Sequence, residues 1–111
     1  MSDERGRRVG VNEAIFRQVN EQIRGLNREF GTEGDTMTVI CECGDADCTE
    51  QFELEVSDYE RVRANARCYV IASGHEVSDV ERVVEQTGSY DVVEKQDGEA
   101  AELARKTDPR S

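Results

Sequence analysis

The chain has 111 residues and a formal net charge of −11, with 36% hydrophobic and 5% aromatic residues and no tryptophan. This length is typical of one domain with a modest core, which gains much from an added cross-link such as a bound metal ion. The negative charge argues against nucleic-acid binding through the acidic body and against anionic membrane surfaces, because both kinds of partner require basic side chains.

The charge is unevenly distributed along the chain. Residues 1–30 carry six arginines and five carboxylates, whereas residues 31–111 carry eight basic and twenty acidic groups. No apolar run approaches the ~20 residues of a transmembrane helix, and the start MSDERGRRVG has no hydrophobic signal segment. We therefore expect a cytoplasmic protein, in whose reducing environment clustered cysteines indicate metal binding or redox chemistry more than structural disulfides.

Residues 1–11 are polar and arginine-rich, and we expect a flexible arm there. A helix is predicted over residues 12–30, with Asn12 as its N-cap and Gly31 as its C-terminal stop. Its apolar residues recur at steps of three and four positions, as Ile15, Val19, Ile23, Leu26 and Phe30. This stripe predicts that the helix packs on its own domain, and a second possibility is that it dimerises or docks on a protein partner.

Two strands are predicted next, over TMTVICE and TEQFELEV, with CGDADC as the turn between them. The sequence SDYE then has the pattern of a capping box that starts a helix at Ser57, with Tyr59 and Val62 facing inward. RCYVIA, at residues 67–72, is short and apolar enough for a buried strand.

The C-terminal third continues with SGHEVSD as a turn or a brief helical segment. ERVVEQ and YDVVEK then flank the turn TGS and predict a hairpin, and GEAAELARK predicts a short helix. Residues 107–111 are expected to be a frayed tail. The order of elements predicts one α+β domain over residues 12–106, with a long N-terminal helix, a mainly antiparallel sheet and short middle and C-terminal helices.

Three of the four cysteines lie within the eight residues CECGDADC. Cys41 and Cys43 are two positions apart at the end of a predicted strand, so their side chains project from one face. The turn that follows can bring Cys48 back to the same point. Three thiolates so placed can reach one Zn²⁺ ion at Zn–S distances of about 2.3 Å, which predicts a metal-bearing hairpin.

A tetrahedral site needs a fourth ligand, and the candidates are His75 and Cys68. His75 is the only histidine, and it follows a glycine in a turn directly after a buried strand, where its imidazole can point toward the hairpin. Cys68 lies inside that strand and is typical of a small core residue, since free cysteine is among the most buried residue types. We therefore favour Cys41, Cys43, Cys48 and His75 as the ligands of a structural zinc ion.

Other uses of the cysteines remain open. A disulfide between Cys43 and Cys48 is feasible, whereas one between Cys41 and Cys43 would be strained. An iron–sulfur cluster would use Cys68 as its fourth thiolate. A thiol-based redox or metal sensor, whose hairpin is released on oxidation, is the alternative to a structural zinc protein.

No catalytic constellation is recognisable in the sequence. A catalytic zinc ion keeps an open position, whereas four protein ligands would close the shell. HExxH, nucleophile-elbow, P-loop and dinucleotide-binding motifs do not occur. We therefore expect no enzymatic activity, and predict a protein-interaction or regulatory adaptor that acts through helix 12–30, the acidic face, or both.

The ordered set of motifs resembles a family of small, mostly uncharacterised actinobacterial proteins. The matching features are NEAIFRQVNEQI, CECGDADCTE, the helix SDYERVR, the GHE turn and ERVVE…YDVVEK, which together cover most of residues 12–97. The resemblance implies that Cys41, Cys43, Cys48 and His75 are a shared metal-ligand set and that Cys68 is a generic hydrophobic position. It implies no particular activity.

Overall fold

The computed structural model describes residues 2–29, 36–45, 47–77 and 80–110. The helices are α1 (Ser2–Glu29), α2 (Val56–Arg63) and α3 (Glu99–Lys106). The strands are β1 (Thr36–Ile40), β2 (Gln51–Glu55), β3 (Cys68–Ile71), β4 (Glu81–Gln86) and β5 (Asp91–Lys95). The protein is thus α+β with a long N-terminal helix, as the sequence predicts.

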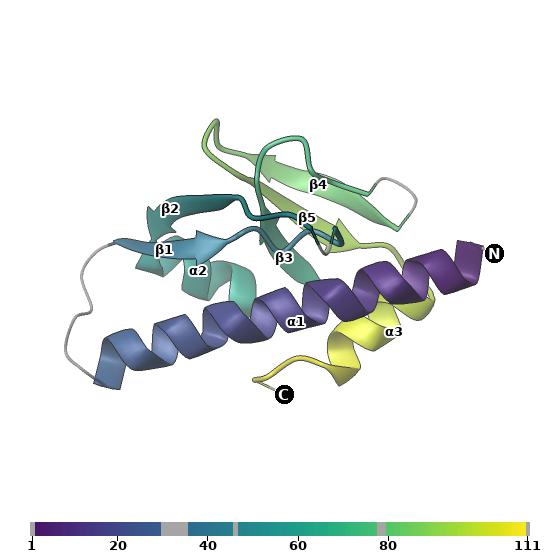
Figure 1. Ribbon diagram of the computed structural model, residues 1–111, viewed down its shortest axis with the longest axis horizontal. Coiled ribbons are helices and arrows are strands. Elements are labelled where there is room, and N and C mark those ends of the chain that lie inside the picture. The colour runs from purple at the N-terminus through teal and green to yellow at the C-terminus, as the bar shows by residue number, and fades with distance from the viewer. Residues whose placement is uncertain (1, 30–35, 46, 78–79, 111) are drawn as a thin grey trace.

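The strands form two antiparallel sheets rather than one. β1 pairs with β2, and the other strands form a three-stranded sheet in the order β3-β5-β4. α1 runs along one side of the molecule below both sheets, with α3 beside its N-terminal half (Figure 1). α2 packs against β2 and β3. The segment between β1 and β2, which carries three cysteines, therefore lies between the sheets and α1.

The predicted strands and the predicted C-terminal hairpin are confirmed. β1 and β2 are in register from Thr36 opposite Glu55 to Ile40 opposite Gln51. β4 and β5 form the hairpin predicted from ERVVEQ and YDVVEK, with an irregularity between Val83 and Glu85. All four residues of β3 are buried, as expected of a short apolar strand covered on both faces.

The middle helix begins differently from the prediction. α2 starts at Val56 with Glu55 as its N-cap, and no side chain donates or accepts a capping hydrogen bond there. The capping box predicted at Ser57 is therefore wrong. Tyr59 and Val62 are nevertheless buried, as predicted, because their spacing of three places both on the inward face of the helix.

The apolar core lies between the hairpin, α2 and the three-stranded sheet. Its largest cluster of buried residues consists of Met37, Val39, Leu54, Tyr59, Val62, Cys68, Val70, Tyr90 and Val92. Phe52 stacks on Tyr90 with ring centroids 5.4 Å apart at the edge of this cluster. Among the described side chains of α1, only Ile23 packs at the margin of this cluster, so most of the helix between residues 8 and 26 packs on something else.

The face that α1 turns inward is polar, so the prediction that its apolar stripe packs on the domain holds only for the half-buried Val19 and Ile23. Its buried residues are Gly10, Glu13, Arg17, Asn20 and Arg24. Of the predicted stripe, Ile15 and Leu26 are 54% and 51% exposed. Phe30 and the stop residue Gly31 lie outside the described residues.

Partners distant in sequence explain why polar side chains take the inward face. Glu13 forms a buried ion pair with Lys95, which also pairs with Glu81. The Arg17 guanidinium donates to the carbonyl oxygens of Ala66 and Ala104 and lies over the Tyr69 ring, 4.6 Å from its centroid. Burying charged groups costs free energy unless they are paired, and here the sheet and α3 supply the pairs.

The two ends of the chain are more ordered than the sequence suggests. α1 begins at Ser2 instead of Asn12, so residues 2–11, expected to be an arm, are helical. Arg110, in the expected tail, pairs through its guanidinium with the carboxylates of Glu21 on α1 and Glu60 on α2. No helix in the described ranges is both long enough and apolar enough to cross a membrane.

The buried Glu13 gives the fold a characteristic pH dependence. Burial raises the pKa of Glu13 well above its usual 4.5, and the nearby Glu81 carboxylate adds to this effect against the opposing charge of Lys95. At any pH between the ordinary and the raised pKa, the folded protein holds a proton that the unfolded chain has lost. The contribution of Glu13 to stability is therefore greatest at low pH and falls as the pH rises through that interval.

We predict that Glu13→Gln flattens this decline in stability, because a neutral amide has no proton to lose. Urea unfolding of the wild type and the variant between pH 5 and pH 9 tests the prediction. Glu53→Gln, which removes an exposed carboxylate on β2, is the matched control and should keep the wild-type slope. Parallel slopes for the wild type and Glu13→Gln would contradict the assignment.

Candidate metal centre

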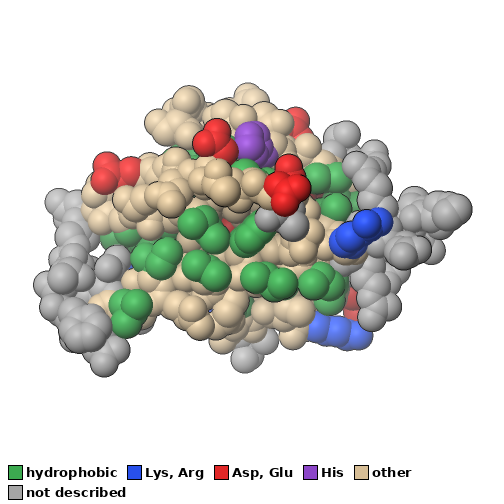
Figure 2. Space-filling view, in the orientation of Figure 1, with side chains coloured by type: hydrophobic (Ala, Val, Ile, Leu, Met, Phe, Trp, Pro, Cys, Tyr) green, Lys and Arg blue, Asp and Glu red, His purple; other side chains and the backbone are tan. Residues whose placement is uncertain are grey.

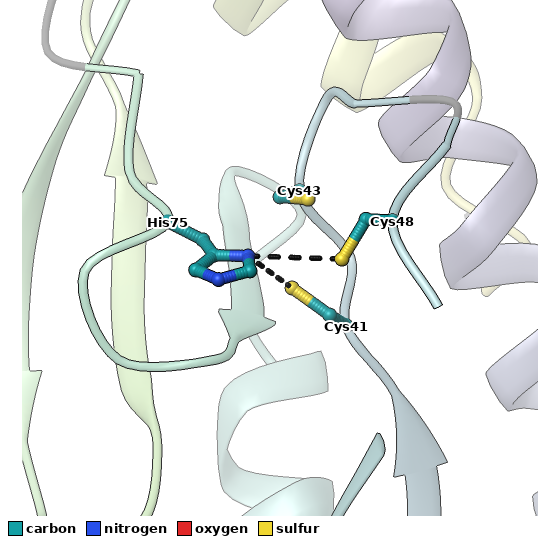
Figure 3. Close-up of side chains that lie close together, drawn as sticks. All are labelled: Cys41, Cys43, Cys48 and His75. Atoms are coloured by element: carbon teal, nitrogen blue, oxygen red, sulfur yellow. Dashed lines mark hydrogen bonds between the residues drawn. The ribbon is translucent and has the colours of Figure 1, made fainter. Parts of the chain in front are cut away.

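Four potential metal ligands meet at one point between the hairpin and the turn after β3. The Sγ atoms of Cys41, Cys43 and Cys48 and a ring nitrogen of His75 all lie within 4.8 Å of one another. His75 Nδ1 faces the sulfurs, and its distances to Cys41 Sγ and Cys48 Sγ are both 3.7 Å (Figure 3). The other ring nitrogen points away from the sulfurs (Figure 3). The residues predicted to form the site are thus close enough to bind a metal ion.

The distances from His75 Nδ1 to Cys41 Sγ and Cys48 Sγ fit a tetrahedral ion. With Zn–S of about 2.3 Å and Zn–N of about 2.0–2.1 Å, tetrahedral angles place a sulfur and a nitrogen ligand about 3.6 Å apart. The two observed distances of 3.7 Å agree with this value. Three sulfurs and one imidazole are also a donor set typical of structural zinc sites.

The hairpin positions the three thiols through its backbone. The Cys41 N–H donates to the Glu50 carbonyl oxygen at 2.9 Å and so extends the β1–β2 ladder by one bond. The chain then turns, and the Cys48 N–H donates to the Asp45 carbonyl oxygen at 3.0 Å. Gly44 lies so close to α1 that a Cβ atom there would be 2.3 Å from a methyl carbon of Val9. A side chain at position 44 would therefore push the loop away from the helix.

The turn after β3 positions the imidazole. Gly74 has φ of +84°, a conformation that favours glycine, and its N–H donates to an Asp91 carboxylate oxygen at 3.1 Å. The His75 N–H donates to the Ala72 carbonyl oxygen at 3.1 Å and closes the turn. The Ala72 N–H donates to Cys41 Sγ at 3.1 Å. A hydrogen bond of this kind orients the sulfur, as partners of metal ligands commonly do.

Glu42, between the first two cysteines, is fully buried and points away from the site. Along an extended chain, neighbouring side chains alternate, so the two thiols face His75 while Glu42 enters the protein. Its carboxylate accepts hydrogen bonds from Asn20 Nδ2 at 2.7 Å, the Val70 N–H at 3.0 Å and the buried Arg63 guanidinium at 3.3 Å. One residue thus joins the cysteine loop to α1, α2 and β3.

Asn20 and Asn12 fix the loop to α1. The Asn20 side chain donates to the Ile40 carbonyl oxygen and accepts from the Ile40 N–H, both at 2.9 Å. Asn12 Nδ2 donates to the Gly44 carbonyl oxygen at 2.9 Å. The sequence predicts Asn12 only as a helix cap, and its hydrogen bond to the cysteine loop was missed. The two asparagines lie eight residues apart on α1, about two helical turns, and this spacing was the available signal.

The chemistry of the thiols depends strongly on burial. Burial raises the pKa of Cys41 and of Cys43 above the usual value for a thiol, and it also raises that of Cys68. A raised pKa lowers the fraction of nucleophilic thiolate. Cys68 does not belong to the group of four, and its side chain packs in the apolar cluster with Val39 and Val70.

An open pocket lies against the candidate metal centre. It is lined by Cys43, Gly44, Asp45, His75, Glu76 and Val77. Asp45 and Glu76 are exposed, so carboxylates stand beside the approach to the ligands. Negative charge at this position attracts cations toward the sulfurs.

The comparisons with known proteins add no relative of this chain. No protein-family model, no curated protein and no solved structure matches it. What can be inferred about its function therefore comes from the geometry of the four ligands and their surroundings.

Removal of the Glu42 carboxylate should be strongly destabilising. We predict that Glu42→Ala lowers the free energy of unfolding by about 3–5 kcal/mol, because it leaves the Arg63 guanidinium buried without its carboxylate. Urea unfolding at neutral pH measures the loss. Glu50→Ala, an exposed carboxylate on the same hairpin, should change stability by less than about 0.5 kcal/mol. Equal effects of the two substitutions would show that Glu42 does not anchor the loop.

Proposed function

We propose that the protein binds one Zn²⁺ ion through Cys41, Cys43, Cys48 and His75, and that the ion is structural. The observation that carries this proposal is the convergence of three sulfurs and an imidazole nitrogen within 4.8 Å of one another. Zinc suits this donor set better than the hard cations, which prefer oxygen ligands. Four protein ligands leave no position for a substrate or a reactive water molecule.

The zinc ion would connect two segments that no strand pairing joins directly. Cys41, Cys43 and Cys48 belong to the β1–β2 hairpin, whereas His75 follows β3 in the other sheet. The free energy of binding a structural zinc ion contributes directly to folding, and reaches about 10 kcal/mol or more in small zinc domains. For a chain with few aromatic residues, such a link between two small sheets is a large stabilisation.

We further propose that the protein is non-catalytic and acts by binding other macromolecules as a cytoplasmic interaction or regulatory adaptor. Two surfaces support this role. One is the acidic body, which suits a basic protein partner and disfavours nucleic acid. The other is helix 12–30, whose apolar residues include the exposed Ile15 and Leu26. The resemblance to small actinobacterial proteins with the same hairpin and GHE turn fits a shared metal site and stays a hypothesis.

Elemental analysis of the purified protein tests the ligand set. We expect one equivalent of zinc in the wild type and in Cys68→Ala, and a loss of most of the zinc in His75→Ala. Removal of zinc with a chelator should lower the thermal midpoint by about 10 °C or more, since a loss of even 2–3 kcal/mol has that effect in a domain of this size. Zinc retained by His75→Ala but lost from Cys68→Ala would contradict the assignment.

A redox sensor that uses the same ligands is the second candidate, and the partial exposure of Cys48 favours it. Oxidation would join two thiolate sulfurs in a disulfide. The two electrons released, together with two protons from solvent, would reduce one hydrogen peroxide molecule to two water molecules, and the zinc ion would dissociate. We predict the outcome expected of a structural zinc ion. In millimolar peroxide, zinc should be released no faster than the protein unfolds. A zinc-binding dye and circular dichroism, recorded together, measure the two rates. Complete zinc release from protein that is still folded would favour the sensor.

A further inference from the structure

The outward side of α1 carries a stripe of apolar and uncharged polar residues that no other part of the described chain covers. It runs through the exposed residues Val11, Ile15, Gln18, Gln22 and Leu26. Val11, Ile15 and Leu26 are 42%, 54% and 51% exposed. Hydrophobic side chains follow α1 on the face of the molecule shown in Figure 2. Large apolar side chains gathered along one helix are typical of an interaction surface, whereas isolated ones are common on any protein.

This stripe carries no carboxylate, although the chain has a net charge of −11. Among the described side chains of α1, the carboxylates are Glu13 and Glu21. Glu13 is fully buried, and the Glu21 side chain is 10% exposed and accepts hydrogen bonds from Tyr59 and Arg110. Two copies of so acidic a protein repel each other, and contact through the stripe avoids placing carboxylates against carboxylates.

The order of residues along the stripe suits an antiparallel pair of identical helices. The residues of the stripe follow one another at steps of four, three, four and four positions, so they form one line along the helix that can face a partner. In antiparallel contact about a centre between residues 18 and 19, Val11 of one copy faces Leu26 of the other, and Ile15 faces Gln22. Glutamine amides both donate and accept hydrogen bonds, so Gln18 can bond its own symmetry mate. Antiparallel helix dipoles also attract.

We propose that a second copy of this chain packs on α1 through this stripe and forms a two-fold symmetric, antiparallel dimer. This proposal rests on the interaction role of helix 12–30 proposed above and specifies the partner. The proposed dimer does not depend on zinc. A parallel pair is disfavoured because it would place Arg8 beside Arg8 at one end. A dimer of this kind has an isologous interface, in which the same residues serve both copies.

The expected affinity follows from the size of the contact. The stretch from Val11 to Leu26 is about 24 Å long, at 1.5 Å per residue. One helix of this length buries less than the ~800 Å² per partner that is typical of stable complexes. The dimer should therefore be weak and should dissociate on dilution through the micromolar range.

Sedimentation equilibrium of the full chain as purified, over a range of concentrations, tests the proposal. We expect a monomer–dimer equilibrium in the wild type, and a dissociation constant at least roughly tenfold larger for Ile15→Gln and for Leu26→Gln. The matched control is Val84→Gln, which removes a 43% exposed apolar side chain on β4, away from α1, and should leave the equilibrium unchanged. Added salt should strengthen the dimer, because it screens the repulsion between the acidic bodies.

Charged substitutions test the antiparallel order. Val11→Glu and Leu26→Lys should each abolish the dimer. An equimolar mixture of the two variants should restore it, because the carboxylate introduced at position 11 of one copy then faces the ammonium group introduced at position 26 of the other. In a parallel pair these two positions would not meet. A mixture that remains monomeric would overturn the antiparallel order.

A wild type that is monomeric up to about 1 mM would overturn the proposal, as would a dimer that is unaffected by Ile15→Gln and Leu26→Gln or weakened equally by Val84→Gln. Zinc content, measured on the same samples, separates this proposal from the proposed metal site. A zinc-free dimer would refute only the site, whereas a monomer with one zinc ion would refute only the dimer.

Discussion

The buried carboxylate of Glu42 is the contact on which the arrangement of this protein depends. It lies between two cysteines and reaches Asn20 on α1, Arg63 on α2 and the backbone of β3. Because neighbouring side chains alternate along an extended chain, this inward anchor fixes the opposite direction of Cys41 and Cys43. The candidate metal ligands and the anchor to the polar interior therefore lie on opposite sides of one segment, residues 41–43.

The polar interior also explains the surface. α1 places Glu13, Arg17 and Asn20 against the sheets, where Lys95, the backbone of α3 and Glu42 pair with them. With polar groups on its inner face, α1 keeps Phe16, Val19 and Ile23 half-buried at its sides and exposes Val11, Ile15 and Leu26 on its outer face. The same packing that holds the hairpin in place thus leaves the stripe on α1 exposed, which is the basis of the proposed dimer.

The sequence predicts the elements well, and it predicts that Cys41, Cys43, Cys48 and His75 come together, since strand alternation, glycine-containing turns and cysteine spacing are local signals. It predicts the inward face of α1 wrongly. Periodicity locates an apolar stripe but cannot say that Glu13 will meet Lys95, 82 positions away, or that Arg17 will meet Tyr69. Glu42 was missed as an anchor for the same reason: its partners come from three separate elements.

X-ray absorption at the zinc edge of the purified, full-length protein tests the central claim most directly. A Cys₃His site predicts three sulfur ligands at about 2.3 Å and one imidazole nitrogen at about 2.0–2.1 Å. Four sulfur ligands would replace His75 with a fourth thiolate and contradict the geometry of the turn after β3. Zinc bound by oxygen and nitrogen ligands alone, or folded protein without zinc, would contradict the claim that these cysteines form a metal centre.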